Sequence, residues 1–359
     1  MTQQHPSTVP ALKRSPGQAV KDFATSLGSK GYLIVVGALV LIVGSALSPY
    51  FLTQRNLVTV LITASVVSVL AVGQYLVIVT GGIDLSVGAV AALSSVAVGL
   101  TLQQGIPWPI ALLMALLVAG LIGIFNGLMI VFGGVTPFIV TLAMLSLARG
   151  VAYVLQTGRQ VPIDDQGFLS AFVGNYGPQP APIVIALVVT VLAALMMSQT
   201  RYGRRLYALG GNPEAARLSG LPVKRDVITA YFLSSLLAGL AGVMIAAQLT
   251  EGSAIIGDGY ELNAIAAVVV GGASLFGGTG DPVSAVIGGL IIAVILNIMD
   301  LLGIQAQPQL IVKGAVILLA VLFTSGVGSK LPNVIRKLIF QWRYTGASGV
   351  AVATTREKL

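Results

Sequence analysis

Ten stretches of this sequence are long and apolar enough to cross a lipid bilayer, and this feature constrains the fold more than any other. A spanning helix needs about 20 mostly apolar residues. The sequence therefore predicts an all-α integral membrane protein with about ten transmembrane helices, in which the short eighth or tenth run can be a half-helix instead of a full span. The runs are 31–47, 57–79, 86–103, 108–132, 136–156, 180–198, 227–250, 261–277, 283–301 and 309–325.

The scarcity of charged residues excludes an ordinary soluble enzyme. Only 9% of the 359 residues are charged and 56% are hydrophobic, whereas soluble globular domains carry about 25% charged residues. The chain has no cysteine, and its one histidine, His5, lies in a polar N-terminal stretch. Thiol and imidazole chemistry therefore have no candidate in the apolar part, and we expect neither a metal site, nor a cofactor, nor an intramembrane active site.

The positions of Lys and Arg predict the orientation in the membrane. If the N-terminus is cytoplasmic, 16 of the 20 Lys and Arg fall in cytoplasmic segments, as the positive-inside rule requires. The other four lie in outer loops or near the outer ends of helices, and ten spans place both termini in the cytoplasm. The formal charge of +8 is thus an orientation signal, and no nucleic acid partner is expected.

The chain divides into a membrane domain and two tails. Residues 1–30 are predicted to be a cytoplasmic tail, 31–325 the transmembrane domain and 326–359 a second cytoplasmic tail. Apolar residues recur at helical spacing within 20–27 and 334–342. They predict helices that lie on the cytoplasmic membrane surface, with an extension of the adjacent span as the alternative.

The cytoplasmic segment 199–226 contains a complete set of helix-capping signals. Asn212 is a good N-cap and Pro213 suits the first helical position. Glu214 complements the helix dipole, and Gly220 suits a left-handed residue after the helix. We predict a helix of about two turns, interpreted as a rigid element that transmits force from a soluble motor. The alternative is a loop that merely contains a helical turn.

Nothing in the chain predicts an energy source of its own. Ion-coupled carriers bury ionisable residues within their spans, but the carboxylates here lie at the predicted loop edges. The glycine-rich stretch 271–280 lacks the lysine of a phosphate-binding loop. Uphill transport by this chain would therefore need an ATP-hydrolysing partner.

The stretch 80–88 is interpreted as a gate. Gly81 and Gly82 interrupt the second span, and Asp84 or Ser86 can cap the third. Backbone groups freed by such a break must face protein or water. The stretch 271–280 is a second glycine-rich break at the same side, and the pair suggests an internal repeat around a pathway. Close helix packing through glycine is the alternative.

Four long motifs, in order along the chain, carry a family resemblance. They are GGIDLSVG at 81–88, TPFIVTL at 136–142 followed by ARG at 148–150, YGRRLYALGGNPEAARLSGLPV at 202–223, and GYELNAIAAVV at 259–269 followed by GGASLFGG at 271–278. Together they resemble the permease subunits of bacterial ABC importers for monosaccharides, most closely the ribose permeases. Asn263 departs from the aspartate common in that family, and we expect it near the outer face.

The resemblance implies a permease of the bacterial plasma membrane that moves a monosaccharide, ribose or a related pentose or hexose. It implies a homodimer with the pathway along its two-fold axis, a cytoplasmic ATP-binding subunit, an extracytoplasmic sugar-binding protein and a lipid surround. A same-fold permease for a branched-chain amino acid or a signalling furanose stays open, as does a stand-alone secondary carrier. The outer loop 157–179 is a candidate landing surface for the binding protein.

The resemblance also assigns residues to two sites. The coupling helix would comprise Asn212, Glu214, Ala215, Ala216, Arg217 and Gly220. The gate and pathway candidates, chosen as glycines of the breaks and polar or aromatic residues near them, are Gly81, Gly82, Asp84, Ser86, Asn126, Asn263, Phe276, Gly277 and Gly278. Because polar side chains in membrane helices also bond neighbouring helices, contacts between helices are the alternative role.

Overall fold

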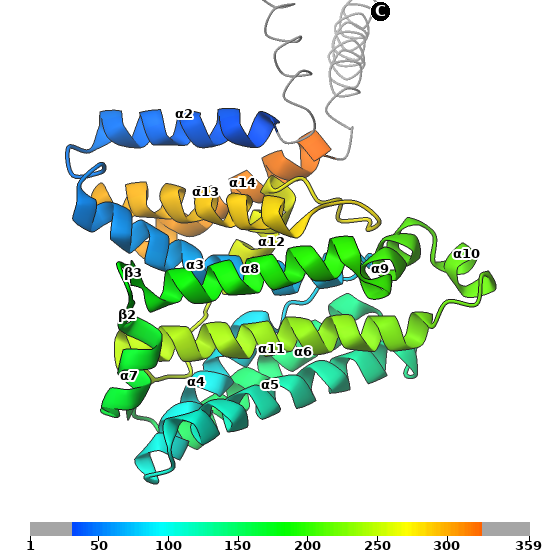
Figure 1. The fold of residues 1–359 in the computed structure, drawn as a ribbon, viewed down its shortest axis with the longest axis horizontal. Coiled ribbons are helices and arrows are strands. Elements are labelled where there is room, and N and C mark those ends of the chain that lie inside the picture. The colour runs from blue at the N-terminus through cyan, green and yellow to red at the C-terminus, as the bar shows by residue number, and fades with distance from the viewer. Residues whose placement is uncertain (1–30, 325–359) are drawn as a thin grey trace, which may run out of the picture.

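The computed structural model describes residues 31–324, and this part of the chain is mostly helical (Figure 1). The predicted surface helices of both tails lie outside the described residues. Ten helices are apolar: α2 (Gly31–Leu47), α3 (Gln54–Ile78), α4 (Val87–Gln103), α5 (Trp108–Val131), α6 (Pro137–Gln156), α8 (Ala181–Gln199), α11 (Val223–Leu249), α12 (Tyr260–Val270), α13 (Pro282–Leu301) and α14 (Ala306–Thr324). The others are α7 (Gln166–Val173), α9 (Arg201–Gly211) and α10 (Pro213–Leu218).

Four very short strands complete the described part. They are β1 (Val161–Pro162), β2 (Asn175–Tyr176), β3 (Gln179–Pro180) and β4 (Glu251–Gly252), and they form two antiparallel pairs, β1 with β4 and β2 with β3. Six helices, α3, α5, α6, α8, α11 and α13, are long and apolar enough to cross a membrane. The chain is thus an integral membrane protein by length and composition of its helices.

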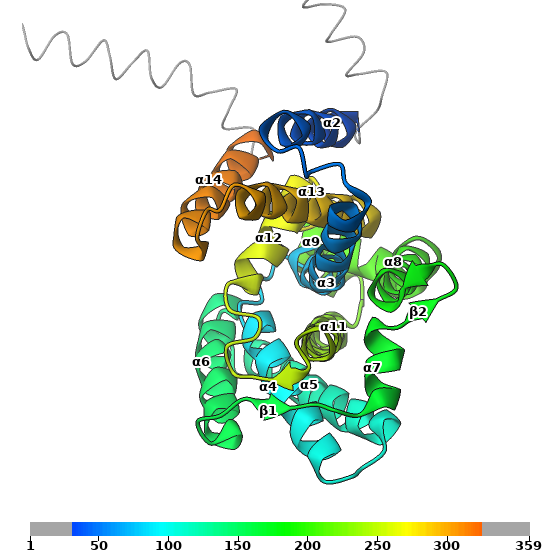
Figure 2. The same cartoon turned by 90° about the vertical axis from the view of Figure 1, so that its left-hand side faces the viewer.

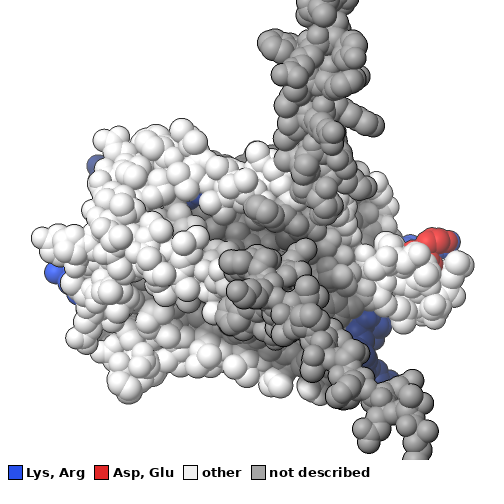
Figure 3. All heavy atoms as spheres, turned by 90° about the horizontal axis from the view of Figure 1, so that it is seen from above, with Lys and Arg blue, Asp and Glu red and all other residues white. Residues whose placement is uncertain are grey.

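The long helices run side by side along the molecule, which gives it two distinct ends (Figure 1). The α10 end carries α9 and α10, and the opposite end carries α7, β2 and β3. Seen from above, acidic and basic atoms gather mainly at these two ends, and the surface between them is largely uncharged (Figure 3). This distribution is that of a protein whose middle lies in hydrocarbon.

Glycines let the central helices pack at backbone distance. A Cβ at Gly123 or Gly127 of α5 would meet the backbone of α11 at 2.5 Å and 2.7 Å. A Cβ at Gly242 of α11 would collide with the Ala91 backbone of α4. Because lipid gives helices no hydrophobic reason to associate, such close approach is a main source of their packing energy. The core is therefore built around α3, α4, α5 and α11.

Two non-helical segments interrupt the helical bundle. Residues 79–86 link α3 to α4 as predicted, and residues 250–259 link α11 to α12. The second segment runs antiparallel along α4: the Ser253 amide donates to the Ser95 hydroxyl (3.1 Å), and a Cβ at Gly257 would meet Gly88 O at 2.5 Å. It therefore enters the bundle from the end that carries β4 and turns into α12 beside the first turn of α4.

The position of α12 corrects two expectations. We predicted an apolar run over 261–277, but α12 has 11 residues and ends at Val270, with 271–280 as a loop. The half-helix is thus the eighth predicted run. We also expected Asn263 near the outer face, but it is 3% exposed and lies one turn into α12, inside the bundle. The reason in both cases is the second non-helical segment, which carries the chain deep into the bundle before α12 begins.

Candidate functional site

The predicted helix in the segment 199–226 is present as α10. The Asn212 side chain accepts a hydrogen bond from the Ala215 amide (2.9 Å), and Pro213 is the first helical residue. Gly220 has a φ of +77°, in the left-handed region that favours glycine. Local signals alone therefore determine where α10 begins and ends.

One face of α10 is open to a partner. Glu214 and Arg217 form an exposed ion pair at 2.7 Å, and the hydrogen bond from Arg217 lowers the pKa of the Glu214 carboxyl below its usual value. Leu218 is 76% exposed, whereas Ala216 is buried. The tip of the molecule therefore exposes an apolar side chain beside an ion pair.

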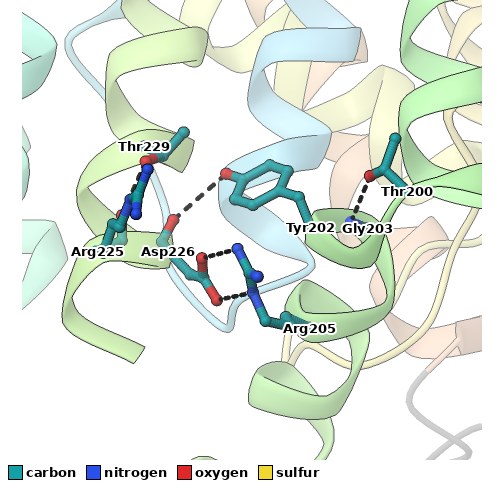
Figure 4. Close-up of polar contacts among 7 residues, drawn as sticks. All are labelled: Thr200, Tyr202, Gly203, Arg205, Arg225, Asp226 and Thr229. Carbon is teal, nitrogen blue, oxygen red and sulfur yellow. Dashed lines mark hydrogen bonds and ion pairs between the residues drawn. The ribbon is translucent and has the colours of Figure 1, made fainter. Parts of the chain in front are cut away.

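The base of this loop is closed by a buried carboxylate (Figure 4). Arg205 of α9 donates two hydrogen bonds to Asp226 of α11, at 2.7 Å and 2.8 Å, and Tyr202 donates to the Asp226 carbonyl (3.3 Å). Asp226 is 1% exposed, and its carboxylate raises the pKa of the Arg205 guanidinium. Bidentate pairs fix relative orientation, so α9 and the start of α11 move as one unit that carries α10.

The end of α9 touches both glycine-rich stretches predicted as breaks. The Gly278 amide donates to the Val79 carbonyl (2.9 Å), which joins the two stretches directly. A Cβ at Gly210 of α9 would collide with both Val79 and Gly278, and Gly277 lies against Gly81 and Gly210. The three segments therefore meet at backbone distance, at the α10 end of the bundle.

The first break, 79–86, is held by a buried carboxylate. Gly81 has a φ of +82° and makes the turn after α3. Asp84 accepts hydrogen bonds from the Ser86 amide (2.9 Å), the Ser86 hydroxyl (2.6 Å) and the Ser234 hydroxyl (3.2 Å) of α11. With its side-chain amide correctly oriented, Gln74 of α3 bonds both the backbone N–H and C=O of Asp84.

The cap of α4 differs in detail from the prediction. Ser86 occupies the N-cap position of α4, but its hydroxyl makes no capping bond. That hydroxyl instead donates to Asp84 and accepts from the Asn126 amide of α5 (3.1 Å). Thr141 of α6 donates to the Ile83 carbonyl (3.3 Å). Four helices, α3, α5, α6 and α11, thus supply polar partners to a break that would otherwise be unsatisfied in lipid.

The second non-helical segment, 250–259, was not predicted as part of a site. Arg149 of α6 donates hydrogen bonds to the carbonyls of Ala254 (2.6 Å) and Ile256 (2.9 Å), and the Gln156 side chain accepts from the Ala254 amide (2.7 Å). Arg149 thus clamps exposed backbone inside the bundle. The signal that could have revealed it is the polar, glycine-containing sequence TEGSAIIGDG ahead of a short apolar run.

Comparison with known proteins identifies the chain. The profile of a family described as branched-chain amino acid transport system / permease component matches residues 56–321. The chain belongs to this family of transport permeases. Curated relatives of this permease include the ribose import permease protein of Escherichia coli (strain K12), 43% identical over 294 residues that cover 81% of this chain and 91% of the relative.

Two further relatives are sugar permeases of the same organism. The D-allose transport system permease protein is 36% identical over 301 residues, which cover 84% of this chain and 92% of the relative. The L-arabinose transport system permease protein is 35% identical over 291 residues, which cover 81% and 89%. No solved structure gives a significant match to the permease. The chain is therefore a multi-pass permease and not an enzyme.

The predicted gate and pathway residues of the permease fall into two groups. Asp84, Ser86 and Asn126 are fully buried, and Asn263 is nearly so. They do not meet in one cluster, because Asp84, Ser86 and Asn126 share hydrogen bonds at the first break whereas Asn263 lies on α12. Gly81, Gly82, Gly277 and Gly278 lie in the two stretches that contact each other, and Phe276 beside them is 82% exposed at the α10 end.

Proposed function

We propose that this permease is the membrane-spanning subunit of an ATP-driven importer of a monosaccharide, ribose or a related pentose or hexose. The observation that carries the proposal is the family membership together with three relatives whose names specify ribose, allose and arabinose. Energy comes from a separate cytoplasmic ATP-binding subunit, and an extracytoplasmic sugar-binding protein delivers the solute.

The coupling helix is α10. Its exposed residues Glu214, Arg217 and Leu218 dock in a groove of the ATP-binding subunit. Asn212 and Gly220 fix its two ends, the exposed Ala215 keeps its outer face slim enough to enter a groove, and the buried Ala216 packs against the permease. The Arg205–Asp226 ion pair supports this role, because a docked helix transmits force only if the chain at its base is rigid.

The topology follows from the same assignment. If α10 is cytoplasmic, the α10 end is the inner end. Ten membrane elements then place both termini inside. They are the apolar helices α2, α3, α4, α5, α6, α8, α11, α12, α13 and α14. A second copy of the chain completes the pathway along a two-fold axis within the lipid. The outer segment 157–179, which contains β1, α7, β2 and β3, is the landing surface for the sugar-binding protein.

The contacts around α9 suggest how the gate moves. ATP binding draws the two motor subunits together, and α10 moves with them. Because α9 contacts the stretches 79–82 and 277–278, its displacement shifts the inner ends of α3 and α13 together. Such a packed unit has discrete arrangements, which a ligand can bias between inward-open and outward-open states. The permease needs only a weak sugar site, since the binding protein supplies specificity.

The test is reconstitution of the full complex in proteoliposomes. We expect ATP hydrolysis to rise when the matching binding protein is loaded with a monosaccharide, and labelled sugar to accumulate inside only when ATP is present. Stimulation by a branched-chain amino acid or a furanose signal instead would reassign the substrate. Accumulation by the permease alone, driven by an ion gradient, would reject the ABC assignment.

A further inference from the structure

Four charged side chains lie on one side of the bundle, and one of them is Arg149, already described as a backbone clamp. Arg149 of α6 approaches Asp258, which precedes α12, at 3.9 Å between nitrogen and oxygen. Lys313 of α14 lies close enough to Glu261 of α12, to Asp300 at the end of α13 and to Asp258 for their charges to act on its ammonium group. The helices α6, α12 and α14 that carry three of these residues lie along the same side of the molecule (Figure 2).

Asp258 lies at membrane depth. Gly88, which contacts Gly257, is 15 residues from the end of α4, or about 22 Å along the helix axis at 1.5 Å per residue. From Tyr260 to the other end of α12 is ten residues, or about 15 Å. Asp258 lies between these two points, far from either end of a bundle whose hydrocarbon layer is about 30 Å thick.

The environment of Asp258 is not one that lipid can supply. Its side chain is 82% exposed on the surface of this single chain, whereas that of Arg149 is 15% exposed. By contrast, α8 has no charged residue, and its exposed middle positions are Leu187, Val188, Val191, Leu192 and Leu195. A carboxylate at the bilayer centre costs free energy, and in membrane proteins it faces water or a partner. The α6–α12–α14 face is therefore not a lipid-facing surface, whereas the α8 face is.

We infer that the face formed by Arg149, Asp258, Glu261 and Lys313 lines the water-filled passage of the permease and offers hydrogen bonds to a neutral polyhydroxylated solute. The face carries charges of both signs, with Arg149 and Lys313 beside the carboxylates of Asp258, Glu261 and Asp300, so it offers both hydrogen-bond donors and acceptors. Guanidinium and ammonium groups donate to hydroxyl oxygens, and carboxylates accept from hydroxyl protons. This inference rests on the proposed function for the identity of the solute, but not for the presence of water.

The geometry gives each group a distinct part. One terminal nitrogen of Arg149 donates hydrogen bonds to the carbonyls of Ala254 and Ile256, and the other lies toward Asp258. The exposed Asp258 is the principal acceptor for the solute. Ile255 on the same non-helical segment is 57% exposed and presents an apolar surface beside it, as the C–H face of a sugar requires.

The absence of cysteine in the chain permits a clean test. Single variants I255C and D258C are compared with L192C, which is 61% exposed in the wild type and lies about 16 Å into α8. The full-length protein is assembled with its ATP-binding subunit in lipid nanodiscs and treated with a charged methanethiosulfonate reagent. A lipid-soluble maleimide controls for the presence of each thiol.

The charged reagent reacts with the thiolate, which forms only when the thiol is hydrated. Burial in lipid raises the pKa of a thiol, and each unit of that rise lowers the fraction present as thiolate about tenfold. We therefore expect the D258C and I255C thiols to react about tenfold or more faster than the L192C thiol. Equal, slow reaction of all three with the charged reagent, despite labelling by the maleimide, would overturn the passage assignment.

A second arm separates this inference from the substrate assignment. Binding protein loaded with ribose, added with ATP, should slow labelling of I255C, in which Asp258 is intact. If a branched-chain amino acid with its binding protein protects the thiol instead, the passage stands and the monosaccharide function fails. If the thiol is fast but neither solute changes its rate, the face is hydrated without contacting the solute, and the inference is overturned.

Discussion

The hydroxyl of Tyr207 on α9 lies 2.7 Å from the hydroxyl of Tyr75 on α3. The same Tyr207 hydroxyl donates to the Gly280 carbonyl at 3.0 Å. One oxygen therefore links the loop that carries α10 to the inner part of α3 and to the stretch that precedes α13. The backbone contacts of Gly210 join the same segments.

Replacing Tyr207 by phenylalanine should weaken coupling without unfolding the permease. Y207F keeps the ring but removes both hydrogen bonds, each worth about 1 kcal/mol, so α9 can move without carrying the two glycine-rich stretches. We expect fewer sugar molecules transported per ATP hydrolysed in proteoliposomes. The control is Y50F, at an exposed tyrosine in the turn between α2 and α3 that lies in none of these segments. An unchanged ratio in Y207F would show that the backbone contacts suffice.

Gly220 should tolerate no side chain, although space around it is open. Its φ of +77° costs an alanine about 1–2 kcal/mol, so G220A distorts the chain after α10 and lowers the affinity for the ATP-binding subunit. The measurement is co-purification of that subunit with tagged permease. Gly211, before α10, also has open space but no left-handed backbone, so G211A should co-purify normally. Equal recovery of both variants would contradict a role for this turn in docking.

The sequence predicted the parts of the site that depend on neighbouring residues. The ends of α10 follow from Asn212, Pro213 and Gly220, because capping is a local interaction. The break after α3 follows from Gly81 and Gly82 for the same reason. In each case the residues that determine the structure lie within a few positions of the element that they end.

The deep start of α12 could not be predicted in the same way. Apart from Glu261 and Asn263, the run 261–277 is apolar in its first half, and its sequence does not indicate how far inside the membrane it begins. That depth is set by contacts between distant residues, such as Gly88 with Gly257 and Arg149 with Ala254. For the same reason, the sequence placed Arg149 merely near an outer helix end and missed its role as a backbone clamp.

Removing the Arg149 clamp should destabilise the permease. R149M keeps much of the side-chain length but leaves two buried carbonyls without their donor, at about 1–3 kcal/mol each. We expect a clear loss of thermal stability in detergent, measured by the temperature at which half the protein aggregates. R159M, in the exposed loop after α6, is the control and should behave like wild type. Equal midpoints would mean that the segment 250–259 is held without Arg149.

The contact between Gly88 and Gly257 should not tolerate an added methyl group. A Cβ on Gly88 would collide with the Gly257 carbonyl and with the Glu261 carboxylate, and the backbone there cannot retreat because Ser95 and Arg149 hold the segment. Overpacking of this kind costs about 1–3 kcal/mol or more, so G88A should lower the yield and melting temperature of folded permease. Gly150 of α6 is the matched control: its Cβ would meet nothing within 4 Å, and alanine favours a helix over glycine by about 1 kcal/mol. G150A should therefore be neutral or slightly stabilising, and a G88A variant as stable as G150A would show that the segment 250–259 is not packed against α4 in the membrane.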